Sequence, residues 1–124
     1  MSRLLLVEDN PMNAKLAERR LRRQGFEVEW VADGLLVQER ALAFQPDAVL
    51  MDLSLPGMDG LDCTRALKSD PRTADVPVVA VTAHALRGDR ERALAAGCVA
   101  YVTKPLDFSA LLGVLKEVLG SRGE

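Results

Sequence analysis

The sequence predicts an α/β fold in which a parallel sheet is covered by helices on both faces. Short apolar runs alternate with longer segments that have the periodicity of amphipathic helices. The runs are too short for helices, and apolar residues at successive positions indicate strands buried on both faces. Several of the runs end directly at polar residues. The predicted strands are residues 3–7, 27–31, 48–52, 78–82 and 100–103.

The first helix is predicted over residues 12–24. Asn10 is a residue type that caps helices, and Pro11 suits the first helical turn because its missing N–H has no partner there. Gly25 is a natural end for this helix. The apolar stripe expected to be buried is Met12, Leu16, Ala17 and Leu21. The other face carries cations that suit the carboxyl end of a helix dipole, namely Lys15, Arg19, Arg20, Arg22 and Arg23.

The remaining helices continue the alternation of strand and helix. The turn at Asp33 and Gly34 leads into a helix over residues 35–44, and a third helix covers residues 61–69. Asp89 is expected to cap a fourth helix that runs to Ala96 and stops at Gly97. The last helix covers residues 108–119. The strand at 27–31 is half polar, so we expect it at an edge of the sheet.

The bulk properties are those of one ordinary domain. The chain has 124 residues and a net charge of −2, which gives no argument for a nucleic-acid partner. Cys63 and Cys98 have no paired spacing and are expected to be reduced thiols. A strand begins close to Met1, which leaves no room for a signal peptide, and no apolar run is long enough to span a bilayer. We therefore expect a cytoplasmic protein without a membrane partner.

Polar residues at the ends of the predicted strands define a candidate site. The carboxyl ends of parallel strands lie at one edge of a sheet, where ligands bind in such folds. This edge would bring together Glu8, Asp9, Asp52, Thr82 and Lys104. Three neighbouring carboxylates repel one another, and Mg²⁺ would relieve this repulsion. Taken alone, Glu8 and Asp9 also fit a solvated acidic helix start, but Asp52 after a second buried strand favours the metal site.

The remaining residues of this edge point to phosphoryl transfer. Lys104 supplies a positive charge that can pair with Asp52 and then with a phosphoryl oxygen, and Thr82 supplies a hydroxyl donor. A carboxylate such as Asp52 is an established acceptor of a covalent phosphoryl group. The bond between Lys104 and Pro105 is a candidate cis peptide, because cis bonds are essentially confined to X–Pro pairs.

A family resemblance rests on five spaced elements in this order. They are Glu8–Asp9, Asp52 with the segment 55–60, Thr82–Ala83, Tyr101, and Lys104–Pro105. With them the sequence resembles a response-regulator receiver domain of the CheY-like, flavodoxin-like type over essentially its whole length. The resemblance implies a (βα)5 doubly wound sheet with strand order 2-1-3-4-5. It is greatest to single-domain, DivK-type regulators, so residues 1–124 are expected to be one receiver domain without an output domain.

The resemblance also implies a role for each matching residue. Asp52 would accept a phosphoryl group from a phosphohistidine on a histidine kinase or a histidine phosphotransfer protein. The implied Mg²⁺ ligands are Asp9, Asp52 and the backbone carbonyl of Ser54, with help from Glu8. Thr82 and Tyr101 would be switch residues, and Lys104 would report the new charge.

The implied output is a surface change rather than catalysis on a substrate. The surface of the fourth helix, fifth strand and fifth helix would change to control the binding of a protein partner. Such a domain is a phosphoacceptor that assists its own phosphorylation and slow dephosphorylation. Three positions depart from or vary within the family pattern. Glu8 stands where many members have Asp, and Ser54 and His84 occupy positions that tune dephosphorylation.

Three other interpretations are open at this point. The segment 83–89 also resembles receivers inside hybrid histidine kinases, so the chain fits an excised receiver. A haloacid-dehalogenase-type phosphatase also uses a strand-end Asp with Mg²⁺, but it needs a second Asp where this chain has Ser54. The third interpretation is a binding module that is never phosphorylated. The complete set of site residues argues against this interpretation.

Overall fold

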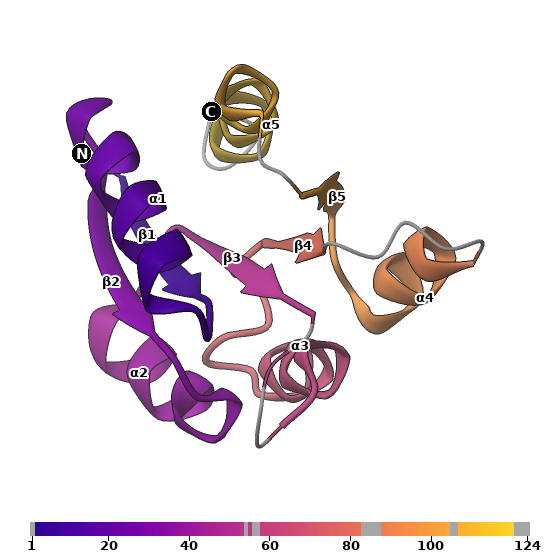
Figure 1. The fold of residues 1–124 in the computed structure, drawn as a ribbon. Helices are drawn as coiled ribbons and strands as arrows, with labels where there is room; N and C mark the ends of the chain where they lie inside the picture. Colours follow the sequence, from indigo (N-terminus) through magenta and orange to yellow (C-terminus); the bar gives the residue numbers. More distant parts are fainter. Residues whose placement is uncertain (1, 54, 56–57, 83–87, 105–106, 121–124) are drawn as a thin grey trace.

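The computed structural model describes residues 2–53, 55, 58–82, 88–104 and 107–120, and it contains the predicted alternation of strands and helices (Figure 1). The strands are β1 (Arg3–Val7), β2 (Glu27–Val31), β3 (Ala48–Asp52), β4 (Val78–Thr82) and β5 (Ala100–Thr103). The helices are α1 (Pro11–Arg23), α2 (Val37–Phe44), α3 (Gly60–Ser69), α4 (Asp89–Ala96) and α5 (Phe108–Gly120), with a 3-10 turn, η1 (Gly34–Leu36), before α2.

All neighbouring strands of the sheet are parallel, in the order β2-β1-β3-β4-β5. This confirms the expected strand order and places the half-polar β2 at an edge. In the register, Val7 pairs with both Val31 and Met51, and Asp52 pairs with Val81. The carboxyl ends of the central strands therefore lie at one edge of the sheet, as the candidate site requires.

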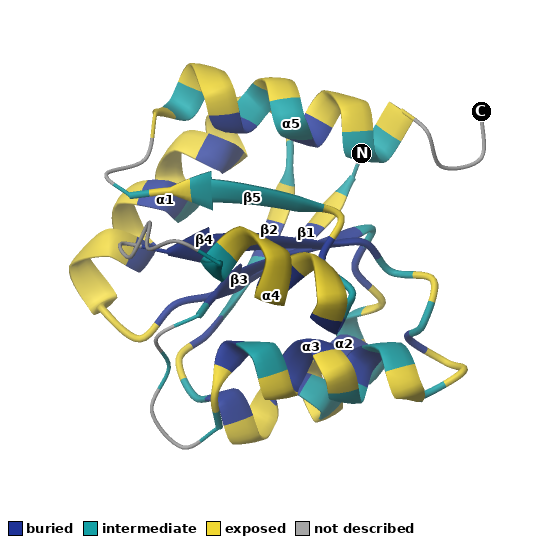
Figure 2. Ribbon diagram, turned by 90° about the vertical axis from the view of Figure 1, so that its right-hand side faces the viewer, coloured by how far each residue is buried: buried dark blue, intermediate teal, exposed yellow. Residues whose placement is uncertain are grey.

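Helices cover both faces of the sheet, and the central strands β1, β3 and β4 are largely buried between them, whereas β5 is only half-buried (Figure 2). Successive strand residues point to opposite faces, so each strand contributes to two cores. The core under α1 and α5 contains Leu4, Leu6, Leu50 and Val79 with Ala14, Ala17, Leu21, Leu111 and Leu115. The core under α2, α3 and α4 contains Leu5, Val7, Val49, Met51 and Ala80 with Val37, Ala41, Cys63, Leu67 and Ala93.

The predicted buried stripe of α1 is wrong in two of its four positions. Asn10 caps the helix as expected, by accepting from the amides of Met12 and Asn13. However, the side chains of Met12 and Leu16 are 79% and 53% exposed. The buried residues of α1 are Ala14, Ala17 and Leu21. Small alanine side chains face the sheet and let the helix backbone approach it closely, and Met12 and Leu16 lie outside this buried stripe.

Two helix starts also differ from the prediction. The segment expected to begin a helix at Leu35 starts as the 3-10 turn η1, because the Asp33 side chain accepts from the Leu35 amide and tightens the first turn. Asp89 is not the cap of α4. Gly88 is the cap residue, with a φ of 90°, and Asp89 is the first helical residue, where its carboxylate pairs with Arg92.

The two cysteines are free thiols, as predicted, and both are buried. The Cys63 thiol lies 3.4 Å from the carbonyl oxygen of Gly34, and the Cys98 thiol lies 3.8 Å from the Thr64 hydroxyl. Burial, with the nearby carboxylates of α3 and its cap, raises the pKa of Cys63 to about 11. Both thiols are therefore packing groups of the core between the sheet and α3.

The start of α3 packs directly on the end of β3. A Cβ at Gly60 would lie 2.5 Å from the Asp52 carbonyl oxygen and 2.7 Å from the Leu53 Cα. These contacts are with backbone, which cannot move aside without displacing the strand end that carries Asp52. Gly60 therefore sets how closely α3 approaches the candidate site.

We expect Gly60→Ala to lower the free energy of unfolding by about 1 to 3 kcal/mol, the usual cost of overpacking. Gly113→Ala is the matched control, because a Cβ at Gly113 in α5 would meet nothing within 4 Å. That control should gain about 0.5 to 1 kcal/mol from the helix propensity of alanine. Urea unfolding monitored by circular dichroism measures both changes, and equal stability of the two variants would contradict the close packing at Gly60.

Candidate functional site

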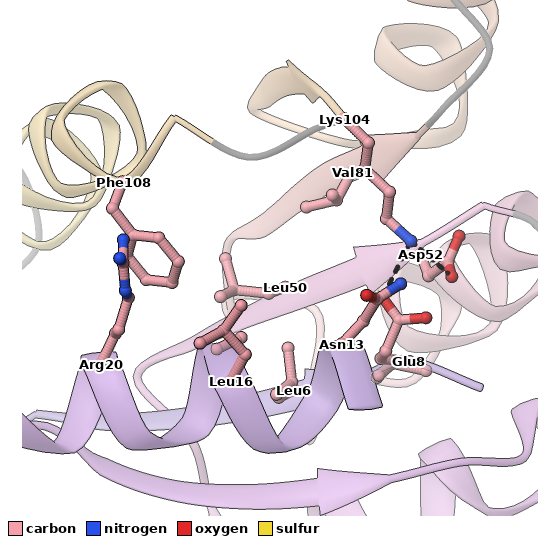
Figure 3. Close-up of a pocket in the computed structure, with 12 residues that line it drawn as sticks. Leu6, Glu8, Asn13, Leu16, Arg20, Leu50, Asp52, Val81, Lys104 and Phe108 are labelled. Atoms are coloured by element: carbon pink, nitrogen blue, oxygen red, sulfur yellow. Dashed lines mark hydrogen bonds and ion pairs between the residues drawn. The ribbon is translucent and has the colours of Figure 1, made fainter. Parts of the chain in front are cut away.

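The centre of the site is the side-chain ammonium of Lys104, which lies between two carboxylates (Figure 3). Its Nζ is 2.8 Å from Oε1 of Glu8 and 3.2 Å from Oδ2 of Asp52. The side chains of Glu8 and Asp52 are 8% and 4% exposed, and that of Lys104 is 20% exposed. The site is therefore a largely buried ion-pair network at the carboxyl edge of the sheet.

Strand geometry brings these residues together from three distant parts of the chain. Glu8 and Asp52 lie two residues beyond Leu6 and Leu50, so the alternation of side chains turns them toward the face of the sheet under α1 and α5. The Lys104 amide donates to the Thr82 carbonyl oxygen at 2.7 Å, which ties the end of β5 to the end of β4. This backbone bond places the Lys104 side chain within reach of both carboxylates.

Glu8 is fixed through both its backbone and its side chain. Its amide donates to the Val31 carbonyl oxygen at 3.0 Å, and its Oε2 accepts from the Asn10 amide at 3.1 Å. Burial raises the pKa of Glu8, and the hydrogen bonds from Lys104 and Asn10 oppose that shift. Burial alone would lower the pKa of Lys104, but the hydrogen bond to Glu8 and the charge of Asp52 raise it, so Lys104 is a cation at neutral pH.

The carboxylates of Glu8, Asp9 and Asp52 fit a divalent cation. Each offers an oxygen, and these oxygens lie within 4.8 Å of one another. Glu8 and Asp52 are buried, whereas Asp9 is exposed. A hard cation such as Mg²⁺ prefers oxygen ligands and keeps several of its waters, so one exposed carboxylate beside two buried ones suits it. The structure thus brings together the three acidic residues that the sequence singled out.

The predicted switch residues lie on the two strands at the far side of Asp52. Thr82 ends β4 and is only 2% exposed. Tyr101 lies in β5, half-buried, and packs against the core under α4. Burial raises the pKa of Tyr101, and Asp89 adds to the shift. Three other positions of the sequence analysis, namely Ser54, His84 and Pro105, lie outside the described residues.

A pocket of about 540 Å³ opens beside this network, between α1, α5 and the sheet (Figure 3). Its floor is apolar, with Leu6, Leu50 and Val81, and its polar end is the network of Glu8, Asp52 and Lys104. At the other end the Arg20 guanidinium lies 4.8 Å from the centre of the Phe108 ring. Sequence reasoning missed this pocket, because Leu16 was assigned to the buried stripe of α1.

The described part of the chain has no helix with the length and apolar character needed to cross a bilayer. The chain matches the model of the response regulator receiver domain family over residues 4–116. Polar-differentiation response regulator DivK of Brucella anthropi is 38% identical over 117 residues, which are 94% of this chain and 95% of that protein.

Solved structures of receiver domains are also similar to this chain. The receiver domain of sensor histidine kinase PA1611 from Pseudomonas aeruginosa, with a magnesium ion coordinated in its active-site cleft, is 42% identical, with a TM-score of 0.89 and coverage of 97% of this chain and 98% of that one. The receiver domain of a histidine kinase from Syntrophus aciditrophicus is 30% identical, with a TM-score of 0.84 and coverage of 100% and 96%. With its parallel sheet and its acidic edge, the chain belongs to the response regulator receiver domain family of two-component phosphorelay signalling.

Proposed function

We propose that Asp52 accepts a phosphoryl group from a phosphohistidine of a histidine kinase or a histidine phosphotransfer protein. The observation that carries this proposal is the Lys104 ammonium, which bridges Asp52 and Glu8 at the carboxyl edge of the sheet. A buried carboxylate that already has a cation beside it can take on the further negative charge of a phosphoryl group. The exposed Asp9 at the same edge supplies a third oxygen for a metal ion.

In the proposed reaction, a carboxylate oxygen of Asp52 forms a bond to phosphorus while the phosphorus–nitrogen bond of the phosphohistidine breaks. The imidazole leaves with the electron pair of that bond and keeps the proton on its other nitrogen. Lys104 exchanges part of its pairing with Glu8 and Asp52 for a phosphoryl oxygen, and the Thr82 hydroxyl donates to another. Mg²⁺ held by Glu8, Asp9 and Asp52 would neutralise negative charge on the transferred group.

The magnesium ion seen in the receiver domain of PA1611 supports the same assignment for this chain. The predicted ligand Ser54 enters this proposal through its backbone carbonyl. The domain is a phosphoacceptor rather than an enzyme with a separate substrate, and it assists its own phosphorylation through the charges of Lys104 and the metal site.

The donor surface in this proposal is the exposed side of α1. Met12 and Leu16 are large apolar side chains exposed to solvent, and Leu16 also lines the pocket next to Asp52. They lie among the cations of α1, which suit an acidic rim on a partner helix. Docking on this surface would bring a donor histidine to the polar end of the pocket.

The output surface in this proposal is formed by α4, β5 and α5. Tyr101 is half-buried on β5, while Leu94 of α4 and Val99, just before β5, are exposed apolar residues. A shift of Thr82 toward the phosphoryl group would free space behind it for Tyr101. The repacked surface would then bind the downstream protein partner differently.

A second candidate function has a specific observation in its favour. The receiver of the sensor histidine kinase PA1611 is 42% identical to this chain, which is higher than the 38% of DivK. The same phosphoacceptor chemistry would then operate within a hybrid histidine kinase. An antibody against residues 1–124 distinguishes the two on a blot of native cells, since the hybrid kinase gives a much larger band.

Incubation with acetyl phosphate and Mg²⁺ should add one phosphoryl group, seen by intact mass, and the product should be cleaved by hydroxylamine as an acyl phosphate. Asp52→Ala should abolish the addition, and excess EDTA should prevent it. Asp62→Ala is the matched control, because Asp62 is an exposed carboxylate that pairs with Arg65. A phosphoryl group that persists in Asp52→Ala would refute the assignment.

Lys104→Met should destabilise the metal-free domain by about 1 to 3 kcal/mol, since it leaves two buried carboxylates without their cation. The pKa of Glu8 should rise further, so the folded state would bind its proton more tightly than the unfolded chain. The loss should therefore shrink as the pH falls toward about 4.5, the ordinary value for glutamate, and should change little below it.

Urea unfolding in EDTA and in Mg²⁺ at several pH values tests this, with Lys116→Met on the exposed side of α5 as control. Mg²⁺ should stabilise Lys104→Met more than the wild type. The variant should still be phosphorylated. However, phosphorylation should no longer change how it binds a phosphorylation-dependent partner. A loss that is independent of both pH and Mg²⁺ would count against the charge role of Lys104.

Replacing both Met12 and Leu16 by Ser should slow phosphotransfer from a phosphohistidine protein by about tenfold, as expected for interface anchors. Phosphorylation by acetyl phosphate should not change, because a small donor needs no docking surface. Leu35→Ser is the matched control, since Leu35 is 66% exposed on η1. Equal slowing with both donors would show that the substitutions damage the site itself.

A further inference from the structure

The indole of Trp30 makes a hydrogen bond to the backbone of the acidic loop. Its Nε1–H donates to the Glu8 carbonyl oxygen at 2.7 Å, across 22 residues of sequence. Trp30 lies in β2, which is next to β1 in the sheet (Figure 1), and its half-buried ring packs against the core under α1. None of the roles assigned above uses this residue.

The hydrogen bond from the Trp30 indole lies at the end of the backbone hydrogen-bond ladder between β1 and β2. The Glu8 amide donates to the Val31 carbonyl oxygen, which extends the ladder one residue beyond the last register pair of Val7 and Val31. A parallel ladder would next have an amide beyond Val31 donate to the Glu8 carbonyl oxygen. However, β2 ends at Val31, and the chain turns into η1. The indole N–H replaces that amide.

The Glu8 carbonyl belongs to the peptide unit that joins the two acidic residues. A peptide unit is planar, so fixing its oxygen also fixes the direction of the Asp9 N–H and limits two backbone angles, ψ of Glu8 and φ of Asp9. Those angles set where the side chains of Glu8 and Asp9 point. Trp30 therefore acts on the relative orientation of the two carboxylates.

The two acidic residues depend on this peptide to different degrees. The Glu8 side chain is also held by the Asn10 amide and by Lys104. The Asp9 side chain is exposed, and the position of its carboxylate follows mainly from the backbone that carries it. Loss of the indole hydrogen bond should thus displace the carboxylate of Asp9, the exposed member of the acidic group, more than that of Glu8.

We propose that Trp30 is a positioning residue for the metal site, whose indole N–H holds the Glu8–Asp9 peptide in the orientation that binds Mg²⁺. This inference rests on the proposed function, in which Glu8, Asp9 and Asp52 hold that ion. Outer groups that orient metal ligands commonly change metal affinity without touching the ion. Trp30 does so through a backbone carbonyl rather than through a ligand side chain.

The test removes the donor atom and keeps the shape of the ring. Trp30 is the only tryptophan, so a tryptophan auxotroph supplied with L-3-benzothienylalanine replaces the indole N–H by sulfur at this one site. Calorimetric titration with Mg²⁺ should show binding weakened about 3- to 10-fold, as expected for a lost hydrogen bond at an outer position. Trp30→Phe should weaken Mg²⁺ binding at least as much.

Phe26→Leu is the control for packing, because Phe26 is a half-buried aromatic residue of the same core, located before β2 at the opposite end from Glu8. It should lower stability and leave Mg²⁺ affinity unchanged. In the unlabelled protein, Trp30 fluorescence should change with Mg²⁺ at the concentrations found by calorimetry, and Asp9→Asn should remove that change.

Wild-type Mg²⁺ affinity in the benzothienylalanine protein would overturn the inference, even if Trp30→Phe were weakened, since only packing would then be involved. In that case the wild-type protein would still bind Mg²⁺ and take a phosphoryl group from acetyl phosphate, so the proposed function would stand. Absence of Mg²⁺ binding in the wild type would instead overturn both.

Discussion

Electrostatic balance at the carboxyl edge of the sheet is the constraint on which the site depends. Glu8 and Asp52 are carboxylates removed from water, and a pair of such charges is costly to bury without a cation. Lys104 supplies that cation from the far end of the chain. The network makes Lys104 sensitive to any change of charge at Asp52, because every new anionic oxygen there competes with Glu8 for the same ammonium group. In the proposed function, structure and signalling thus depend on the same ion pairs.

The parallel sheet makes this balance possible. Side chains in β1 and β3 alternate between two cores, so the residues that follow Leu6 and Leu50 on the same face are Glu8 and Asp52. Backbone bonds at the strand ends then hold the surrounding segments in place, from the Lys104 amide to the Thr82 carbonyl oxygen and from the Glu8 amide to the Val31 carbonyl oxygen. Gly60 keeps the start of α3 against the end of β3. These backbone contacts hold the described strand ends, and the ion pairs of the charged side chains lie between them.

The sequence was a good guide wherever local pattern and strand topology agree. Apolar runs that end at Asp52 and Thr82 predicted both the strands and the edge at which the polar groups meet, and the helix cap at Asn10 followed from residue type. The pattern failed on α1, where Met12 and Leu16 were expected in the core. Hydrophobicity alone favours large side chains for burial, whereas the distance between helix and sheet selected Ala14 and Ala17. It failed again at Asp89, because the left-handed backbone of Gly88 is a property of the loop that precedes α4.

The sequence by itself determined the α/β fold class, the residues at the ends of the strands and the kind of chemistry that three carboxylates, a lysine and a hydroxyl can perform. These depend on residue type and on order along the chain. The tertiary structure alone decided that Lys104 pairs with Glu8 as well as Asp52, that a pocket opens between α1 and α5, and that Trp30 donates to the acidic loop. Each of these joins residues far apart in sequence, and contact between such residues depends on how the elements pack, which no local pattern records.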